Sequence, residues 1–160
     1  MANILIVYAS LTGNTEEIAE LIAEGIKKQS HTAVLKTAEE CRADEVLNYD
    51  GSLIGLYTWG DGDLPDEFLD FYEELDEVDL TGYPVSLFGS GDTSYDLFCG
   101  AVDTAEAKVK ERGAVIMESS LKIEYSPLDE EKNDCRAFGA RFAYRLASMM
   151  KEEVQNGTCS

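Results

Sequence analysis

Hydroxyl-bearing side chains follow the first apolar segment of the chain and lead into an amphipathic segment. The apolar segment Ile4–Tyr8 runs into a loop whose hydroxyl groups belong to Ser10, Thr12 and Thr15. Free backbone N–H groups at a helix start, together with the positive end of the helix dipole, attract an anion. The first 26 residues contain no lysine or arginine. The loop therefore predicts a phosphate that is held by neutral donors.

The loop contains one glycine, Gly13, and no lysine, so it is neither a triphosphate-binding loop nor a dinucleotide-binding loop. A triphosphate loop needs a lysine and a longer glycine-spaced segment, and a dinucleotide fold needs G-x-G-x-x-G. A mononucleotide cofactor fits the loop better than a triphosphate that is turned over. The alternative is an ordinary capped strand-to-helix turn without a ligand.

Two further polar loops each carry a large aromatic residue. Tyr57–Asp63 contains Trp59, the only tryptophan of the chain, and Gly89–Gly100 contains Tyr95. An aromatic ring among glycines and aspartates is a poor candidate for the core. On neighbouring loops, the two rings can stack on both faces of a flat heteroaromatic group. Taken singly, each ring could equally be an ordinary exposed or half-buried side chain.

Apolar segments typical of strands alternate with segments of helical periodicity. The expected strands are Ile4–Tyr8, Thr32–Lys36, Ser52–Tyr57, Pro84–Phe88 and Ala114–Ile123. The expected helices are Thr15–Gln29, Ala43–Asn48, Asp66–Leu75, Ala101–Arg112 and Asp134–Val154. Strands that are apolar along nearly their whole length imply a parallel sheet buried on both faces. The predicted fold is an α/β, three-layer, doubly wound sheet of five parallel strands in the order 2-1-3-4-5, with a ligand crevice beyond strands 1, 3 and 4.

Length and charge restrict the classes of function. The 160 residues, 44% of them hydrophobic, fit one domain over residues 1–154 with a flexible tail at 155–160. The net charge of −19 arises from 13 basic and 32 acidic side chains. It disfavours nucleic acid and anionic membranes and suits a basic protein partner, although solubility alone would also explain it. The absence of a membrane-length apolar run and of a signal-type segment predicts a cytoplasmic protein.

Four cysteines occur without C-x-x-C spacing, and the chain has one histidine, His31. This pattern predicts free thiols and no structural metal site for Cys41, Cys99, Cys135 and Cys159. A nucleophilic Cys99 is the alternative, but no base lies near it in the sequence, so a buried thiol is the better interpretation.

Three motifs in this order resemble the flavodoxins, small electron carriers that bind FMN. They are Ser10-Leu11-Thr12-Gly13-Asn14-Thr15, Thr58-Trp59-Gly60-Asp61-Gly62 and Gly91-Asp92-Thr93-Ser94-Tyr95-Asp96-Leu97-Phe98-Cys99-Gly100. The resemblance spans nearly the whole chain. No long insertion splits Ala114–Ile123, so the chain is similar to the short-chain kind.

The resemblance implies an FMN site that is built from all three motifs. It implies that the residues of the first motif other than Leu11 hold the phosphate, assisted by Thr58. Trp59 and Tyr95 would lie on the two faces of the isoalloxazine. Backbone groups of Asp92 and Cys99 would meet the pyrimidine edge of the ring. The complete set of implied cofactor-binding residues is Ser10, Leu11, Thr12, Gly13, Asn14, Thr15, Thr58, Trp59, Gly60, Asp61, Ser90, Gly91, Asp92, Tyr95, Phe98 and Cys99.

The resemblance also implies a low-potential one-electron carrier, not an enzyme, that uses semiquinone and hydroquinone states. In the family, the peptide between the residues matched by Gly60 and Asp61 flips, and its carbonyl stabilises the semiquinone. Glycine makes this rotation sterically inexpensive. The second electron adds negative charge near Asp61, Asp63, Asp92 and Asp96, where burial and like charge oppose it.

The implied partners are redox proteins with basic surfaces, namely reductases and iron–sulfur or haem acceptors, and the carrier is expected to be a monomer. Salt should weaken such encounters. The candidate docking residues are Asp66, Glu67, Asp70, Glu73 and Glu74, although an ordinary solvated helix face is an equal alternative.

Two other functions share the predicted topology. A flavin-dependent quinone reductase would need a nicotinamide site, and no second nucleotide motif is visible. A phospho-acceptor receiver domain would need clustered acidic residues after the first strand, whereas Ile4–Ser10 contains none.

Overall fold

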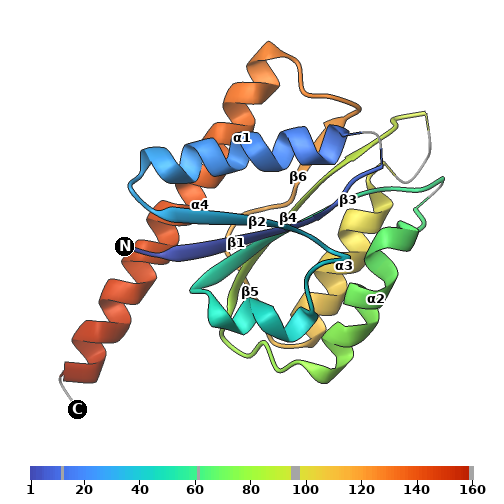
Figure 1. Cartoon of the computed structure of the whole chain (residues 1–160). Helices are drawn as coiled ribbons and strands as arrows, with labels where there is room; N and C mark the ends of the chain where they lie inside the picture. The colour runs from blue at the N-terminus through green and yellow to red at the C-terminus, as the bar shows by residue number, and fades with distance from the viewer. Residues whose placement is uncertain (12, 61, 95–97, 159–160) are drawn as a thin grey trace.

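The computed structural model describes residues 1–11, 13–60, 62–94 and 98–158, and its helices lie on both faces of a central sheet (Figure 1). The strands are β1 (Asn3–Ala9), β2 (Thr32–Thr37), β3 (Gly51–Tyr57), β4 (Pro84–Gly91), β5 (Val115–Ile116) and β6 (Leu121–Glu124). The α-helices are α1 (Asn14–Lys28), α2 (Asp66–Glu74), α3 (Gly100–Glu111) and α4 (Asp129–Thr158). Two 3₁₀-helices are η1 (Ala43–Asn48) and η2 (Leu75–Glu77).

The order of the sheet confirms the predicted topology. The strands run β2-β1-β3-β4-β5 and all pair in parallel. The carboxyl ends of β1, β3 and β4 therefore lie at one edge of the sheet, and the three motif-bearing loops begin there. This edge is the crevice that the doubly wound order predicts.

The predicted strand Ala114–Ile123, at the fifth position of the sheet, was wrong in one respect. In the structure it is interrupted and forms two short strands, β5 and β6. β5 and β6 both pair with β4, through Val85 opposite Ile116 and Phe88 opposite Leu121. An advance of three residues along β4, from Val85 to Phe88, thus lies opposite an advance of five residues, from Ile116 to Leu121. The extra residues form a bulge, which an apolar sequence pattern does not reveal.

A side chain replaces the missing backbone pairs at this bulge. The backbone N–H of Glu118 donates to Ser86 Oγ at 2.8 Å, and the Ser86 hydroxyl donates to the carbonyl of Glu118 at 3.4 Å. Ser86 is fully buried on β4. The short polar side chain therefore satisfies the backbone where the strand departs from the sheet.

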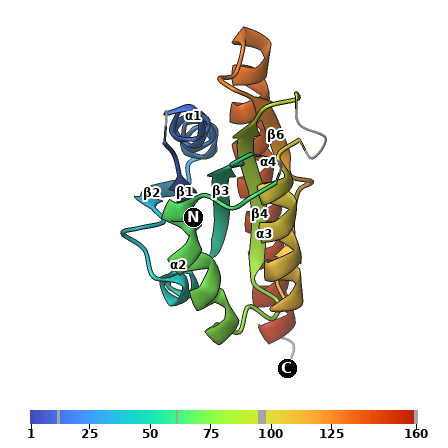
Figure 2. The same ribbon diagram turned by 90° about the vertical axis from the view of Figure 1, so that its right-hand side faces the viewer.

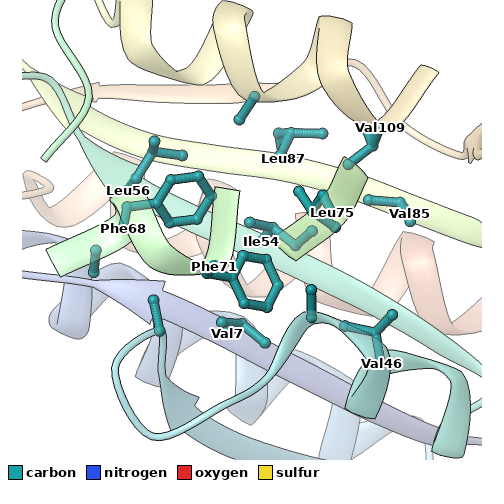
Figure 3. Close-up of a cluster of buried hydrophobic side chains, with 14 of the residues drawn as sticks. Val7, Val46, Ile54, Leu56, Phe68, Phe71, Leu75, Val85, Leu87 and Val109 are labelled. Carbon is teal, nitrogen blue, oxygen red and sulfur yellow. The ribbon is translucent and has the colours of Figure 1, made fainter. Parts of the chain in front are cut away.

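Alternate residues of the strands face two separate hydrophobic clusters. Leu5 and Val7 of β1 point toward the cluster shared with α2, α3 and η1, part of which Figure 3 shows. Ile4 and Ile6 point toward the cluster shared with α1 and α4. Figure 2 shows the same two helical layers from the side. This arrangement confirms the three-layer prediction and fixes the strand ends that carry the loops.

Helices α1 and α4 approach closely because each has a glycine where they meet. A Cβ on Gly25 would lie 1.9 Å from the backbone oxygen of Arg136, and one on Gly139 would lie 2.2 Å from that of Ile22. No larger residue fits either position without separating the helices. The close contact holds α1, the helix that follows the first motif, against α4.

The last helix begins at Asp129, earlier than the predicted Asp134. The backbone N–H of Leu128 donates to Glu131 Oε1 at 3.0 Å, a capping arrangement that stabilises the first turn. The acidic residues of that turn also favour the positive end of the helix dipole. The prediction was wrong at this end because the acidic turn has no apolar periodicity. At its other end the helix continues to Thr158, past the predicted end at Val154. The domain boundary at residue 154 and the flexible tail stay predictions.

Candidate functional site

The first motif forms a tight turn between β1 and α1. The backbone N–H groups of Gly13 and Glu16 donate to Ser10 Oγ at 3.1 and 3.4 Å. Gly13 adopts a left-handed conformation, with φ of 91°, immediately before the helix. Ser10 therefore holds the loop in shape, and its own hydroxyl hydrogen remains available to a ligand. Thr12 lies outside the described residues.

The start of α1 offers unused backbone donors. Among the described residues, the N–H groups of Asn14 and Thr15 have no acceptor, as expected for the first turn of a helix. The hydroxyl of Thr15 lies 2.8 Å from Ser90 Oγ on β4, and these residues are only 1% and 3% exposed. Thr15 thus joins the first loop to the end of a neighbouring strand.

The second motif is a glycine turn closed by two backbone hydrogen bonds. Trp59 and Asp63 each donate their N–H to the carbonyl of the other at 2.9 Å. Gly60 and Gly62 have positive φ angles of 57° and 106°. The indole of Trp59 is 58% exposed, as expected for a ring that does not belong to the core. Asp61 lies outside the described residues.

Tyr57 supports the exposed indole from the end of β3. The centroids of its ring and of the Trp59 ring are 6.4 Å apart, at an interplanar angle of 74°. Its hydroxyl donates to Glu67 Oε2 at 2.6 Å. Burial, and then the hydrogen bond to Glu67, raise the pKa of Tyr57 above its ordinary value. The first turn of α2 is thereby tied to the ring that supports Trp59.

Thr58 links the second loop to its two neighbours. Its backbone N–H donates to the carbonyl of Ser90 at 3.1 Å. Its Oγ1 accepts the N–H of Ala101, in the first turn of α3, at 3.2 Å. The three loops therefore share one hydrogen-bonded base.

The third motif packs a buried thiol beneath the end of β4. Cys99 is 1% exposed and has a left-handed φ of 54°, and burial raises its thiol pKa to about 12. A Cβ on Gly91 would lie 2.9 Å from Cys99 Sγ, so glycine permits this contact. Phe98 is partly buried and packs against the α2–α3 cluster. Tyr95 lies outside the described residues.

Asp92 is fixed in its ionised form on the same loop. Its Oδ1 accepts the N–H of Ser94 at 2.9 Å. This backbone hydrogen bond, and then a side-chain hydrogen bond from Tyr125, lower the pKa of Asp92. The lowered pKa favours a negative charge at this end of the sheet.

Several of these residues enclose a cavity of about 210 Å³. It is lined by Leu11, Asn14, Tyr57, Thr58, Trp59, Ser90, Gly91, Asp92 and Tyr125. The volume lies below the range of about 300–1,000 Å³ that is usual for enclosed ligand pockets. A cofactor seated here would extend beyond the cavity that the described residues form.

The sequence matches one family along most of its length. Residues 6–139 match the family model described as Flavodoxin. A Bacillus subtilis protein named "Probable flavodoxin 2" is 50% identical over 146 residues, which cover 89% of this chain and 95% of the relative. A flavodoxin of Maridesulfovibrio salexigens is 40% identical over 149 residues, covering 91% and 100% of the two chains. The chain belongs to the flavodoxin family.

Solved flavodoxin structures agree with this assignment. The crystal structure of oxidised flavodoxin 2 from Bacillus cereus has a TM-score of 0.86 and 48% identity, covering 90% of this chain and 99% of the other. Flavodoxins are FMN-containing, low-potential electron carriers rather than enzymes, and their partners are redox proteins. Within the described residues, no helix is long and apolar enough to cross a membrane.

The residues that the flavodoxin motifs predict for the cofactor site fall into two groups in the structure. Seven of them line the cavity: Leu11, Asn14, Thr58, Trp59, Ser90, Gly91 and Asp92. The others that are described lie behind the cavity wall or in the turns that shape it: Ser10, Gly13, Thr15, Gly60, Phe98 and Cys99. The motifs thus combine residues that line the cavity with residues that hold those in place.

Sequence reasoning missed the contribution of the loop after β6. Tyr125 lines the cavity, and Ser126 Oγ donates to Asn14 Oδ1 at 2.8 Å. The signal was present, because a tyrosine and a serine follow one residue after the end of the fifth predicted strand. In a parallel sheet the loop after that strand emerges at the same edge as the other three.

Three larger cavities are lined by other residues. One of about 550 Å³ is bordered by His31 and Tyr144, one of about 640 Å³ by Glu118 and Lys122, and one of about 410 Å³ by Tyr83. None of the three is lined by a residue of the three motifs. The candidate site is therefore chosen by the convergence of the loops and not by volume.

Proposed function

We propose that this chain binds FMN across the edge formed by β1, β3 and β4 and uses it to carry single electrons. The phosphate would lie at the start of α1, held by the N–H groups of Asn14 and Thr15 and by the hydroxyls of Ser10, Thr12 and Thr58. The observation that carries the proposal is a pair of N–H donors, without acceptors in the described part of the chain, beside a cavity with an exposed indole wall. Neutral donors and a helix dipole suit a phosphate dianion.

The ring would lie against Trp59, with Tyr95 proposed for its other face. Ser90, Gly91, Asp92 and Cys99 would border its polar edge, and Leu11 would cover the chain between ring and phosphate. When bound, FMN supplies a group that accepts and releases electrons one at a time. Because the cavity is shallow and Trp59 is exposed, one edge of the ring would remain open to a partner.

The residues around the ring would set its affinity for electrons. Gly60 has a left-handed backbone and no Cβ, so the peptide that follows it can rotate toward the ring at small steric cost. The carboxylates of Asp63 and Asp92, with Asp61 and Asp96, oppose added negative charge at this end. Phe98 and Gly13 would shape the loops without supplying polar contacts.

The redox partners would present basic surfaces. The chain carries a net charge of −19, and Asp66, Asp70 and Glu73 on α2 are exposed beside the second loop. Two acidic neighbours have structural partners: Glu67 accepts from Tyr57, and Glu74 accepts the N–H of Ala43 at 3.0 Å. The docking surface is therefore narrower than the run of acidic residues suggests.

We also propose that the carrier acts as a monomer in the cytoplasm. Cys41, Cys99 and Cys135 are free and buried, which suits a reducing compartment. Sedimentation of the FMN-loaded chain at micromolar concentration tests the monomer, and a concentration-dependent increase in mass would contradict it.

Titration of the apoprotein with FMN tests the cofactor site directly. Trp59 is the only tryptophan, so its fluorescence reports on one position of the site. We expect saturable quenching at one FMN per chain. Binding without any change in the emission of Trp59 would place the ring elsewhere, and the absence of binding would overturn the proposal.

Variants of the α2 surface test the partner proposal. Asp66→Asn combined with Asp70→Asn should slow reduction of a basic haem protein such as cytochrome c, and the difference should shrink as salt screens the charges. Glu111→Gln, at the exposed last residue of α3 and thus at the opposite end of that helix from the third loop, is the control. Equal rates for all three proteins at low salt would contradict this docking surface.

A further inference from the structure

Tyr125 has a backbone conformation that its side chain disfavours. Its φ is 55°, in the left-handed region, where glycine and asparagine are common and a bulky aromatic residue is an outlier. The residue directly follows β6. Such strain persists only where other interactions hold it, and it concentrates at functional positions.

Backbone and side chain both fix Tyr125 beside the end of β4. Its N–H donates to the carbonyl of Gly91 at 3.0 Å. Its side chain forms a hydrogen bond that contributes to the lowered pKa of Asp92. Tyr125 is therefore connected to Gly91 and Asp92, two of the four residues proposed to border the polar edge of the ring.

The next residue connects the same loop to the opposite end of the cavity. Ser126 Oγ donates to Asn14 Oδ1 at 2.8 Å, in the first turn of α1. The short segment of Tyr125 and Ser126 thus bridges the proposed phosphate end and the proposed ring end. A displacement of this segment would affect both.

Packing in the core does not explain why an aromatic residue occupies the position of Tyr125. The side chain is 54% exposed, so it contributes little to the core. Leu11 and Trp59, at 59% and 58% exposed, line the same cavity. Three large exposed hydrophobic side chains from three loops gather around one cavity, which is typical of a surface that a ligand covers.

We propose that Tyr125 is a further residue of the FMN site, which forms a side wall of the cavity and shields the bound cofactor from water. This inference rests on the proposed cofactor site. Its hydrogen bond to Asp92 holds the phenol ring in this position, and the strained backbone directs the ring into the cavity. The strain is a cost to the apoprotein that cofactor binding offsets.

The proposal predicts opposite effects on cofactor affinity and on apoprotein stability. Tyr125→Gly removes the wall and relieves the left-handed strain, so the Kd for FMN should rise about threefold to tenfold, the range expected for one aromatic contact. The Tm of the apoprotein should stay the same or rise. Tyr125→Phe keeps the ring and should lie between the wild type and Tyr125→Gly.

Two controls separate this effect from general destabilisation. Tyr125→Asn keeps a residue that tolerates the left-handed conformation, so it should show the same loss of affinity with a native-like Tm. Tyr144→Ala removes an exposed tyrosine from α4, outside the cavity, and should leave the Kd for FMN unchanged.

The measurements are fluorescence titration with FMN and thermal unfolding of the apoprotein, both on the full chain. Unchanged affinity in Tyr125→Gly and Tyr125→Asn, with normal binding by the wild type, would overturn the role of Tyr125 alone. A wild type that fails to bind FMN would overturn the proposed function itself. An equal loss in Tyr144→Ala would also overturn the specific role of Tyr125.

Discussion

The two ends of the candidate site are built in different ways. At the phosphate end, the loop is tied to α1 through Ser10 and to β4 through the buried pair of Thr15 and Ser90. At the proposed ring end, an exposed Trp59 stands on a glycine turn that is closed by two backbone hydrogen bonds with Asp63.

This difference suits two separate roles: one end binds the cofactor, and the other end sets its affinity for electrons. A rigid end with oriented N–H donors binds an anion without reorganisation, so it suits the part of a cofactor that never changes charge. A glycine turn permits backbone rotation, so it suits the part whose charge changes with every electron. We expect substitutions at the first end to alter binding and stability, and those at the second to alter potentials.

The largest effect should follow from removing the phosphate itself. Riboflavin, which lacks this group, should bind the apoprotein at least ~100-fold more weakly than FMN, because two or more charge-assisted hydrogen bonds are worth about 1.5–3 kcal/mol each. Parallel fluorescence titrations with the two flavins measure the ratio. Equal affinities would show that the helix start contributes nothing.

The next effect concerns Thr15. Thr15→Val leaves the buried hydroxyl of Ser90 without its partner, which should lower the free energy of unfolding by about 1–3 kcal/mol and weaken FMN binding. Urea unfolding of the apoprotein and FMN titration measure the two losses. Thr15→Ser keeps the hydroxyl and serves as the control. Wild-type behaviour of Thr15→Val in both assays would refute the stabilising role of this pair.

A smaller effect is expected at Gly60. Gly60→Val should make the first one-electron potential more negative by about 40–90 mV, because a β-branched residue resists the rotated form of the peptide that follows it, at a cost of about 1–2 kcal/mol. Spectroelectrochemistry of the FMN-loaded protein measures the potential. Gly60→Asn should change it less, since asparagine tolerates this conformation. An unaltered potential in Gly60→Val would contradict the division between the two ends.

The smallest expected signal is from Cys99, whose buried thiol has a pKa of about 12. The folded-state pKa lies above the ordinary value, so folding favours the protonated thiol. This stabilisation is complete below about pH 9 and is lost as the pH rises toward 12. Labelling of the native protein with a thiol reagent at pH 8 should leave Cys99 unmodified, as identified by peptide mass. Rapid modification would favour the alternative of a reactive thiol.

The sequence predicted the order of the sheet because apolar strands and amphipathic helices follow one another with little ambiguity. Leu5 and Ile6 illustrate this: both are fully buried, one in each cluster, as a sheet covered on both faces requires. The bulge after Ile116 could not be predicted, because it depends on a hydrogen bond between Ser86 and Glu118 in distant segments.

The candidate site was predictable where a motif is local and unpredictable where it depends on contacts between loops. The convergence of Asn14, Trp59 and Asp92 on one cavity followed from the strand order. The pairing of Thr15 with Ser90 and the approach of Tyr125 did not, since both depend on side-chain positions across the sheet edge.

An anaerobic reductive titration of the FMN-loaded protein tests the central claim most directly. The account predicts two separated one-electron steps, with a long-wavelength absorption band that grows to a maximum near half reduction and then fades. Gly60→Val should diminish that band while FMN remains bound. Bleaching in a single two-electron step, with no such band in the wild type, would contradict the account.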